Sequence, residues 1–128
     1  MPISPQPAVL SVESHSDTAQ LLSCLFSLEG ISCFSADSYE EGLTLIETVR
    51  PDLYLINDLL PGGDGYEFAA RVRSADPDAP FIITSADARP GAARRALAVG
   101  AHAFFFKPYE TPELLRVVRQ LLHERQDC

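Results

Sequence analysis

Apolar residues along the chain form five short runs, and each run is followed by a segment in which apolar residues recur at helical spacing. The runs cover residues 8–12, 31–34, 53–56, 80–84 and 101–106. The helical segments cover residues 17–28, 38–49, 66–75, 90–99 and 111–122. Short apolar runs that alternate with helices predict a parallel sheet, buried on both faces by helices in right-handed crossovers. The predicted fold class is therefore α/β.

The ends of the predicted helices carry residues that favour helix starts and stops. Ser38 and Glu41 form a capping box before the second helix, and Pro51 ends it. Gly30 and Gly100 follow the first and fourth helices, where glycine readily terminates a helix. These signals predict one domain over residues 8–124, preceded by a flexible leader (residues 1–7) and followed by a short tail (residues 125–128).

The composition is that of one soluble globular domain, with 128 residues of which 46% are hydrophobic and 22% charged. No apolar run approaches the roughly 20 residues that span a bilayer, and the N-terminus lacks the zones of a signal peptide. We therefore expect a cytoplasmic protein that does not contact membranes. The cysteines lack metal-ligand spacing, so Cys24 and Cys33 are predicted to be small core residues and Cys128 a free thiol.

Charge is distributed unevenly along the chain. The formal net charge of -8 argues against nucleic-acid binding by this domain alone. Arg50 is the only basic residue before Gly65, and the other nine basic residues follow it. An acidic side and a mixed or basic side suit a docking surface, and they are equally compatible with plain solvation.

The chain is organised around residues 51–65, where a buried strand runs into polar residues and then into a turn rich in glycine and proline. The polar residues are Asn57 and Asp58. Open α/β sheets bind their ligands at the carboxyl ends of the strands, so these two residues mark the candidate site.

This stretch resembles the third strand and following loop of the receiver domain of two-component response regulators, which reads Pro-Asp-hydrophobic run-Asp-x-x-x-Pro-x-x-Asp-Gly. The matching residues are Pro51, Asp52, Pro61, Asp64 and Gly65. The phospho-accepting aspartate of the family falls on Asn57. The resemblance extends over residues 8–122, and it implies a three-layer, doubly wound (βα)5 flavodoxin-like fold with strand order 2-1-3-4-5.

Other residues fall on the remaining functional positions of a receiver. The two acidic magnesium ligands after the first strand correspond to Glu13 and Ser14. The Thr or Ser followed by Ala after the fourth strand corresponds to Ser85, and the Lys-Pro after the fifth strand begins at Lys107. The aromatic switch residue of the family corresponds to Phe104.

The missing carboxylates determine the predicted function. In receivers an aspartate attacks a phosphoryl group, while a cation and a lysine neutralise the charge on the phosphoryl oxygens. The amide of Asn57 cannot form an acyl phosphate, and Glu13 is the one remaining magnesium carboxylate, so Mg²⁺ binding should be weak or absent. We expect Lys107 to pair with Glu13 or to donate to Asn57. The predicted protein is a non-enzymatic, phosphorylation-independent interaction module without a cofactor.

Alternatives remain open for the chemistry of the site. Asp58, or an aspartate at position 57 of the natural protein, would allow conventional phosphoryl transfer from a histidine kinase. Because neighbouring strand residues point to opposite faces, Asp58 should point away from the pocket that Asn57 enters. His15 with Asp58 or Asp64 could form a transition-metal site, although a lone loop histidine is more commonly solvated. A nucleotide or flavin site rests on topology alone.

A candidate interaction face lies on the fourth helix, fifth strand and fifth helix, the region that receivers use to dimerise or dock. Its residues are Arg94, Arg95, His102, Phe104, Arg116 and Arg119. Partners implied by the resemblance are a histidine kinase, a regulator, an output domain or a second copy. The alternative is a solvated charged face. The helical layers on both sides of the sheet are expected to bury most of the Phe104-Phe105-Phe106 run.

Overall fold

The computed structural model describes residues 6–126 and contains a five-stranded parallel sheet. Its strands are β1 (Ala8–Val12), β2 (Ser32–Ala36), β3 (Leu53–Asn57), β6 (Phe81–Ser85) and β7 (Ala103–Phe106). Their spatial order is β2-β1-β3-β6-β7, which confirms the predicted order 2-1-3-4-5. The predicted turn after β3 contains a short antiparallel pair, β4 (Leu59–Leu60) and β5 (Gly63–Asp64).

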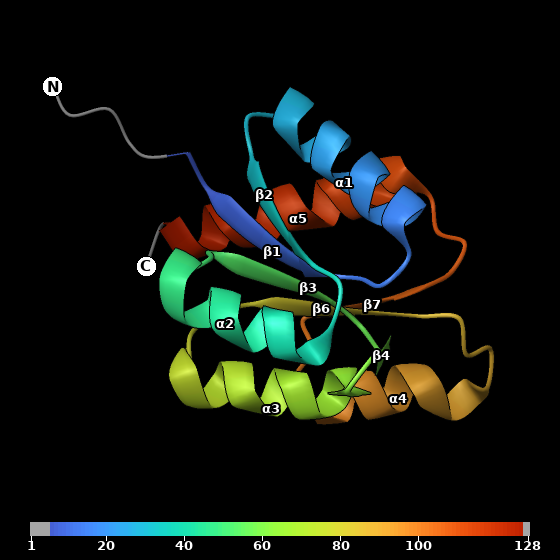
Figure 1. Cartoon of the computed structure of the whole chain (residues 1–128). Coiled ribbons are helices and arrows are strands. Elements are labelled where there is room, and N and C mark those ends of the chain that lie inside the picture. The colour runs from blue at the N-terminus through green and yellow to red at the C-terminus, as the bar shows by residue number, and fades with distance from the viewer. Residues whose placement is uncertain (1–5, 127–128) are drawn as a thin grey trace, which may run out of the picture.

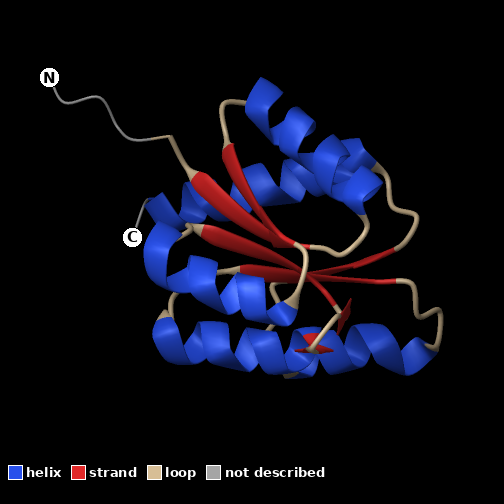
Figure 2. Ribbon diagram, viewed as in Figure 1, coloured by secondary structure: helices blue, strands red, loops and turns tan. Residues whose placement is uncertain are grey.

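Five helices cover the two faces of this sheet. They are α1 (Ser16–Leu28), α2 (Tyr39–Val49), α3 (Gly65–Ala75), α4 (Pro90–Ala98) and α5 (Thr111–Gln126). Helices α1 and α5 lie on one face, and α2, α3 and α4 lie on the other (Figure 1). Figure 2 shows the resulting three layers, with the sheet enclosed between helices. Within residues 6–126, no helix is long and apolar enough to cross a membrane.

Alternation along the buried strands separates two hydrophobic cores. In β3, Tyr54 and Ile56 belong to the core under α2, α3 and α4, whereas Leu53 and Leu55 belong to the core under α1 and α5. Strand side chains point alternately to opposite faces, and all five residues of β3 are buried. A buried central strand therefore fixes the layer into which each residue at its carboxyl end is directed.

Local capping interactions follow the sequence signals. The Ser38 hydroxyl accepts a hydrogen bond from the amide of Glu41 (3.2 Å), which confirms the predicted start of α2. Arg50, at the end of α2, has a left-handed backbone (φ 52°) just before Pro51. Helix α3 is capped by Asp64, which accepts from the amide of Glu67 at 2.8 Å. Because of this cap, α3 begins directly after the β4–β5 turn.

Arginine side chains attach α4 to α3. The guanidinium of Arg95 lies 3.9 Å from the ring centroid of Tyr66 and 4.0 Å from a carboxylate oxygen of Asp64. At the C-terminal end of α4, Nη1 of Arg73 donates to the carbonyl of Val99 (3.3 Å). Helices α3 and α4 are therefore joined along their lengths by side chains as well as through the sheet.

Two expectations about side-chain burial are corrected by the structure. Cys24 is exposed on α1, because it lies on the helix face turned away from the sheet. Cys33 is partly buried, and burial raises the pKa of its thiol. Phe104 and Phe105 are partly buried, but Phe106 is 45% exposed because β7 is the last strand of the sheet and the run ends at its carboxyl edge.

Regular structure and hydrogen bonds extend past both ends of residues 8–124. Helix α5 continues to Gln126, so residues 125 and 126 are helical rather than part of a tail. At the other end, Pro7 and Gln6 accept hydrogen bonds from the amide and hydroxyl of Ser32, respectively. The remaining leader residues and Cys128 lie outside the described residues.

Candidate functional site

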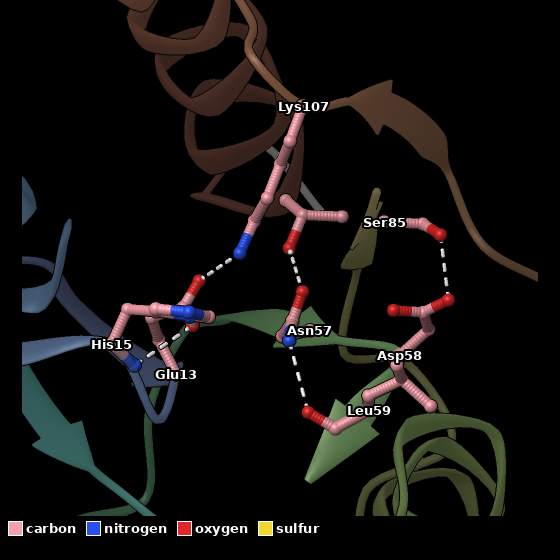
Figure 3. A network of polar contacts seen from close by, with 8 residues as sticks. Glu13, His15, Asn57, Asp58, Leu59, Ser85 and Lys107 are labelled. Atoms are coloured by element: carbon pink, nitrogen blue, oxygen red, sulfur yellow. Dashed lines mark hydrogen bonds and ion pairs between the residues drawn. The ribbon is translucent and has the colours of Figure 1, made fainter. Parts of the chain in front are cut away.

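The candidate site lies at the carboxyl ends of β1, β3, β6 and β7. Because these strands are parallel, their carboxyl ends meet at one edge of the sheet and bring Glu13, Asn57, Ser85 and Lys107 together (Figure 3). Glu13, Asn57 and Ser85 are only 4%, 7% and 0% exposed. Buried polar groups need partners, so their hydrogen bonds define what the site can do.

An ion pair joins the first and last of these strand ends. The Nζ atom of Lys107 lies 2.5 Å from Oε1 of Glu13. The other oxygen, Oε2, accepts from the backbone amide of His15 (3.1 Å) and lies 3.3 Å from its Nδ1 atom. Burial raises the pKa of Glu13, but the hydrogen bonds from Lys107 and the His15 amide outweigh burial and hold it below the ordinary value. Glu13 is therefore an ionised, fully engaged carboxylate.

The amide of Asn57 is satisfied by two groups outside this ion pair. Its Nδ2 atom donates to the carbonyl of Leu59 (2.9 Å), and its Oδ1 atom accepts from the Thr84 hydroxyl (3.3 Å). Of the two roles expected for Lys107, the structure shows the pairing with Glu13, while Asn57 bonds elsewhere. Asn57 thus ties the end of β3 to β6 and to the β4–β5 turn.

Asp58 takes a different set of partners from Asn57. Its Oδ2 atom accepts a hydrogen bond from the Ser85 hydroxyl at 2.6 Å (Figure 3). The same hydroxyl oxygen accepts from the amide of Asp87 (2.9 Å). Ser85, at the position of the family's Thr or Ser, therefore donates its hydroxyl to Asp58.

Strand register explains these pairings. Asn57 is aligned with Thr84 in the β3–β6 ladder, and the amide of Asp58 donates to the Thr84 carbonyl (2.9 Å), which extends the ladder beyond β3. Side chains of neighbouring residues point to opposite faces, so Thr84 faces Asn57 and Ser85 faces Asp58. The same alternation thus separates the polar residues of the site into two sets.

Asp87 continues the second set towards α4. Its carboxylate accepts from the Nε, Nη2 and backbone amide groups of Arg89, at 2.7 to 3.1 Å. These hydrogen bonds lower the pKa of Asp87 to about 2. Arg89 is the N-cap residue of α4, so this interaction closes the loop between β6 and α4.

The residues at the family's magnesium position do not fit a magnesium ion. Both oxygens of Glu13 are engaged, Ser14 supplies an exposed hydroxyl instead of a carboxylate, and the Asn57 oxygen accepts from Thr84. Mg²⁺ favours carboxylate oxygens that are free to coordinate it. Across the described part of the chain, no group of three or more His, Cys, Asp or Glu residues is placed to hold a metal, and His15 is 75% exposed.

The charged residues of the predicted interaction face point in several directions. Arg95 is turned towards α3, as described above. Arg119 forms an ion pair with Glu29 at the end of α1, and Arg116 pairs with Glu113 on its own helix. Arg119 therefore belongs to the α1 side of α5 rather than to a surface shared with α4.

Two exposed apolar side chains on α4 and β7 were not singled out by the sequence pattern. Leu97 of α4 and Phe106 of β7 are 57% and 45% exposed. Arg94 and His102 are exposed as well, whereas Phe104 is partly buried and packs against the core under α4. Helical periodicity could have revealed Leu97, because it falls outside the buried positions Ala92 and Ala96.

Comparisons with known proteins identify the family. Residues 9–119 match the model of the response regulator receiver domain. Regulatory protein AtoC of Escherichia coli is 29% identical over 114 residues, which are 89% of this chain and 25% of AtoC, so this chain spans about a quarter of that relative. Sporulation initiation phosphotransferase F of Bacillus subtilis is also 29% identical over 114 residues, with 89% of this chain and 92% of the relative covered.

A solved structure agrees with these sequence relationships. The receiver domain of the Francisella response regulator 1452 superposes with a TM-score of 0.86 at 28% identity, covering 92% of this chain and 98% of that one. The fold and the extent of the sequence match lead to the same family. The chain belongs to the response regulator receiver domain family.

Proposed function

We propose that this receiver domain works in two-component signalling as a protein interaction module that does not depend on phosphorylation. The observation that carries the proposal is the environment of Asn57, which stands at the acceptor position with both ends of its amide hydrogen-bonded to Thr84 and Leu59. Forming an acyl phosphate requires a carboxylate nucleophile, and an amide oxygen is a poor substitute.

The state of Lys107 supports the proposal. In a phospho-accepting receiver, this ammonium group neutralises charge on the phosphoryl oxygens. Here it is committed to the buried carboxylate of Glu13 at 2.5 Å. A magnesium ion would have to displace Lys107 or His15 from Glu13, so the domain functions without Mg²⁺ as a binding module rather than an enzyme.

The partner is proposed to bind on the surface formed by α4, β7 and α5. Exposed Leu97 and Phe106 supply apolar contact area, and exposed Arg94 and His102 lie on α4 and directly before β7. Interfaces of this type combine an apolar centre with a polar rim. The occupant is a histidine kinase, a regulator, an output domain or a second copy of the domain.

The test of the proposal is incubation with acetyl phosphate and Mg²⁺, followed by intact-protein mass spectrometry. The wild-type protein should keep its unmodified mass. A phosphorylated wild-type species that hydroxylamine removes would overturn the proposal, because hydroxylamine cleaves acyl phosphates. Asn57→Asp is the matched variant: its phosphorylation would locate the block at the missing carboxylate alone.

A second candidate function is phosphoryl acceptance by Asp58. It is favoured by one observation, the 2.6 Å hydrogen bond between Asp58 and Ser85, since Ser85 stands where the family's phosphoryl-binding hydroxyl lies. Asp58 also lines a solvent-open groove of about 730 Å³. In the same mass-spectrometry experiment, a phosphorylated wild type that disappears in Asp58→Asn would establish this candidate.

A further inference from the structure

The hydrogen bond between Asp58 and Ser85 gives Asp58 a role that the family pattern does not assign to its position. We propose that Asp58 is a positioning residue whose carboxylate holds Ser85, and with it the loop between β6 and α4, in one fixed position. Its negative charge takes the part that a phosphoryl group plays in a phosphorylated receiver. This inference rests on the proposed function, in which no phosphate reaches the site.

The first step concerns the Ser85 hydroxyl. Ser85 is fully buried, so its hydroxyl cannot exchange its partners for water. It donates to Oδ2 of Asp58 at 2.6 Å and accepts from the amide of Asp87 at 2.9 Å. A hydrogen bond to a carboxylate is stronger than one between neutral groups. The donor of Ser85 is therefore committed to Asp58.

The second step concerns the backbone of Asp58. The Asp58 amide donates to the Thr84 carbonyl (2.9 Å), and the Asp58 carbonyl accepts from the amide of Gly65 (2.8 Å). The backbone of Asp58 is thus fixed between the end of β6 and the start of α3. With the backbone fixed, only the side-chain torsions of Asp58 lose conformational entropy when its carboxylate binds Ser85.

The third step leads from Ser85 to α4. The amide held by Ser85 belongs to Asp87, and the Asp87 carboxylate binds Arg89, the N-cap residue of α4. A continuous series of hydrogen bonds thus runs from Asp58 to the first turn of α4. We call these residues, Asp58, Ser85, Asp87 and Arg89, the tether.

A consequence follows for signalling. In a phosphorylated receiver, a new anion at the strand end attracts the hydroxyl at this position and draws its loop inward. Here an anion is already present in the chain, and the hydroxyl already donates to it. Phe104, whose strand neighbours β6, packs against the core under α4, in keeping with a settled arrangement of this region. The loop therefore has one resting position that no phosphoryl group is needed to create.

The tether is tested by amide hydrogen exchange, measured residue by residue by NMR without any phosphodonor. Asp58→Ala should accelerate exchange at the Asp87 amide by about tenfold or more, because removing the acceptor frees Ser85. Asp58→Asn keeps an acceptor oxygen and should restore most of the protection. Asp64→Asn is the matched control: it removes a carboxylate from the same groove but keeps an oxygen that can cap α3, so it should leave the Asp87 amide protected.

A double-mutant cycle provides the decisive comparison. Ser85→Ala should accelerate exchange in the β6–α4 loop, and adding Asp58→Ala to it should change little further, because the two residues act through one bond. Unchanged exchange at Asp87 in Asp58→Ala, or additive effects in the double variant, would overturn the tether. Both readouts are independent of phosphorylation, so a failed tether leaves the mass-spectrometry result intact. Conversely, a phosphorylated wild type whose Asp87 amide loses protection in Asp58→Ala would refute the proposed function and the stand-in role of Asp58, but not the hydrogen bonds of the tether.

Discussion

Lys107 and Glu13 lie 94 residues apart in the sequence, yet the Lys107 ammonium nitrogen is 2.5 Å from a Glu13 carboxylate oxygen. Glu13 is 4% exposed, and the Lys107 side chain is 19% exposed. Taking two charges out of water is costly, and the mutual attraction offsets this only while both partners are present. Removing one partner therefore lowers the free energy of unfolding by more than the intact pair contributes to it.

Replacing Lys107 with alanine should lower the free energy of unfolding by about 3–5 kcal/mol at neutral pH, because Glu13 is left as an unpaired buried carboxylate. Urea denaturation followed by circular dichroism measures this change. Arg116→Ala breaks an exposed pair with Glu113 and serves as the control, with a much smaller expected loss because water screens exposed charges. Equal losses in the two variants would contradict a buried, coupled pair.

The stability of the domain should depend on pH through Glu13. Its pKa in the folded state lies below the ordinary value of 4.5, so at acidic pH the unfolded chain binds the proton first. The stabilisation is complete above about pH 4.5 and is lost as the pH falls through the lower folded-state value. Urea denaturation from about pH 6 to about pH 3 should show a steeper loss in the wild type than in Glu13→Gln. If stability falls equally with pH in the wild type and in Glu13→Gln, Glu13 is not the source of the pH dependence.

Restoring the family's aspartate at position 57 should destabilise the fold. Asn57 donates to the Leu59 carbonyl, and the carboxylate of an Asn57→Asp variant would face that oxygen without a proton to donate. The loss should be about 1–3 kcal/mol at neutral pH and should shrink as the new carboxylate is protonated. Thermal unfolding at two pH values measures it. A more stable variant at neutral pH would show that the site accepts a second carboxylate without penalty.

The fold could be predicted from the sequence because its signals are local and repeated. Five apolar runs, each followed by a helical repeat, are sufficient to predict a covered parallel sheet. The resemblance at residues 51–65 then gave the strand order. The capping of α2 by Ser38 was equally local, since the residues that make it are three positions apart.

The side-chain partners within the site could be predicted only in part. Pairing of Lys107 with Glu13 was one of two expectations, because both strands end at the same edge of the sheet. The family pattern gives the position of Ser85 but not its hydrogen-bond partner within the chain. Alternation, which had been applied to Asp58, also applies to β6 and places Ser85 beside Asp58. The register that aligns Asn57 with Thr84 depends on tertiary structure, and no local signal in the sequence specifies it.

A pair of glycines tests how closely the backbone packs around the site. A Cβ atom on Gly65 would lie 2.2 Å from the Asn57 carbonyl oxygen and 2.8 Å from the Asp58 Cα atom, whereas one on Gly91 would meet nothing within 4 Å. Gly65→Ala should therefore cost about 3 kcal/mol or more, since backbone atoms must shift. Gly91→Ala, inside α4, should stabilise by up to about 1 kcal/mol. Chemical denaturation of the two variants checks this contrast, and similar behaviour would contradict it.

The arginine contacts around α4 have a mechanical consequence. Arg89 forms an ion pair with Asp87 at the start of the helix. Arg95 lies over the ring of Tyr66 in the middle of it, and Arg73 donates to the Val99 carbonyl at its end. Because these contacts involve residues at the start, in the middle and at the end of α4, we expect the helix to have little freedom to rotate about either end. If a partner binds α4, as proposed above, it is expected to recognise the side chains that the helix displays rather than a displacement of the helix.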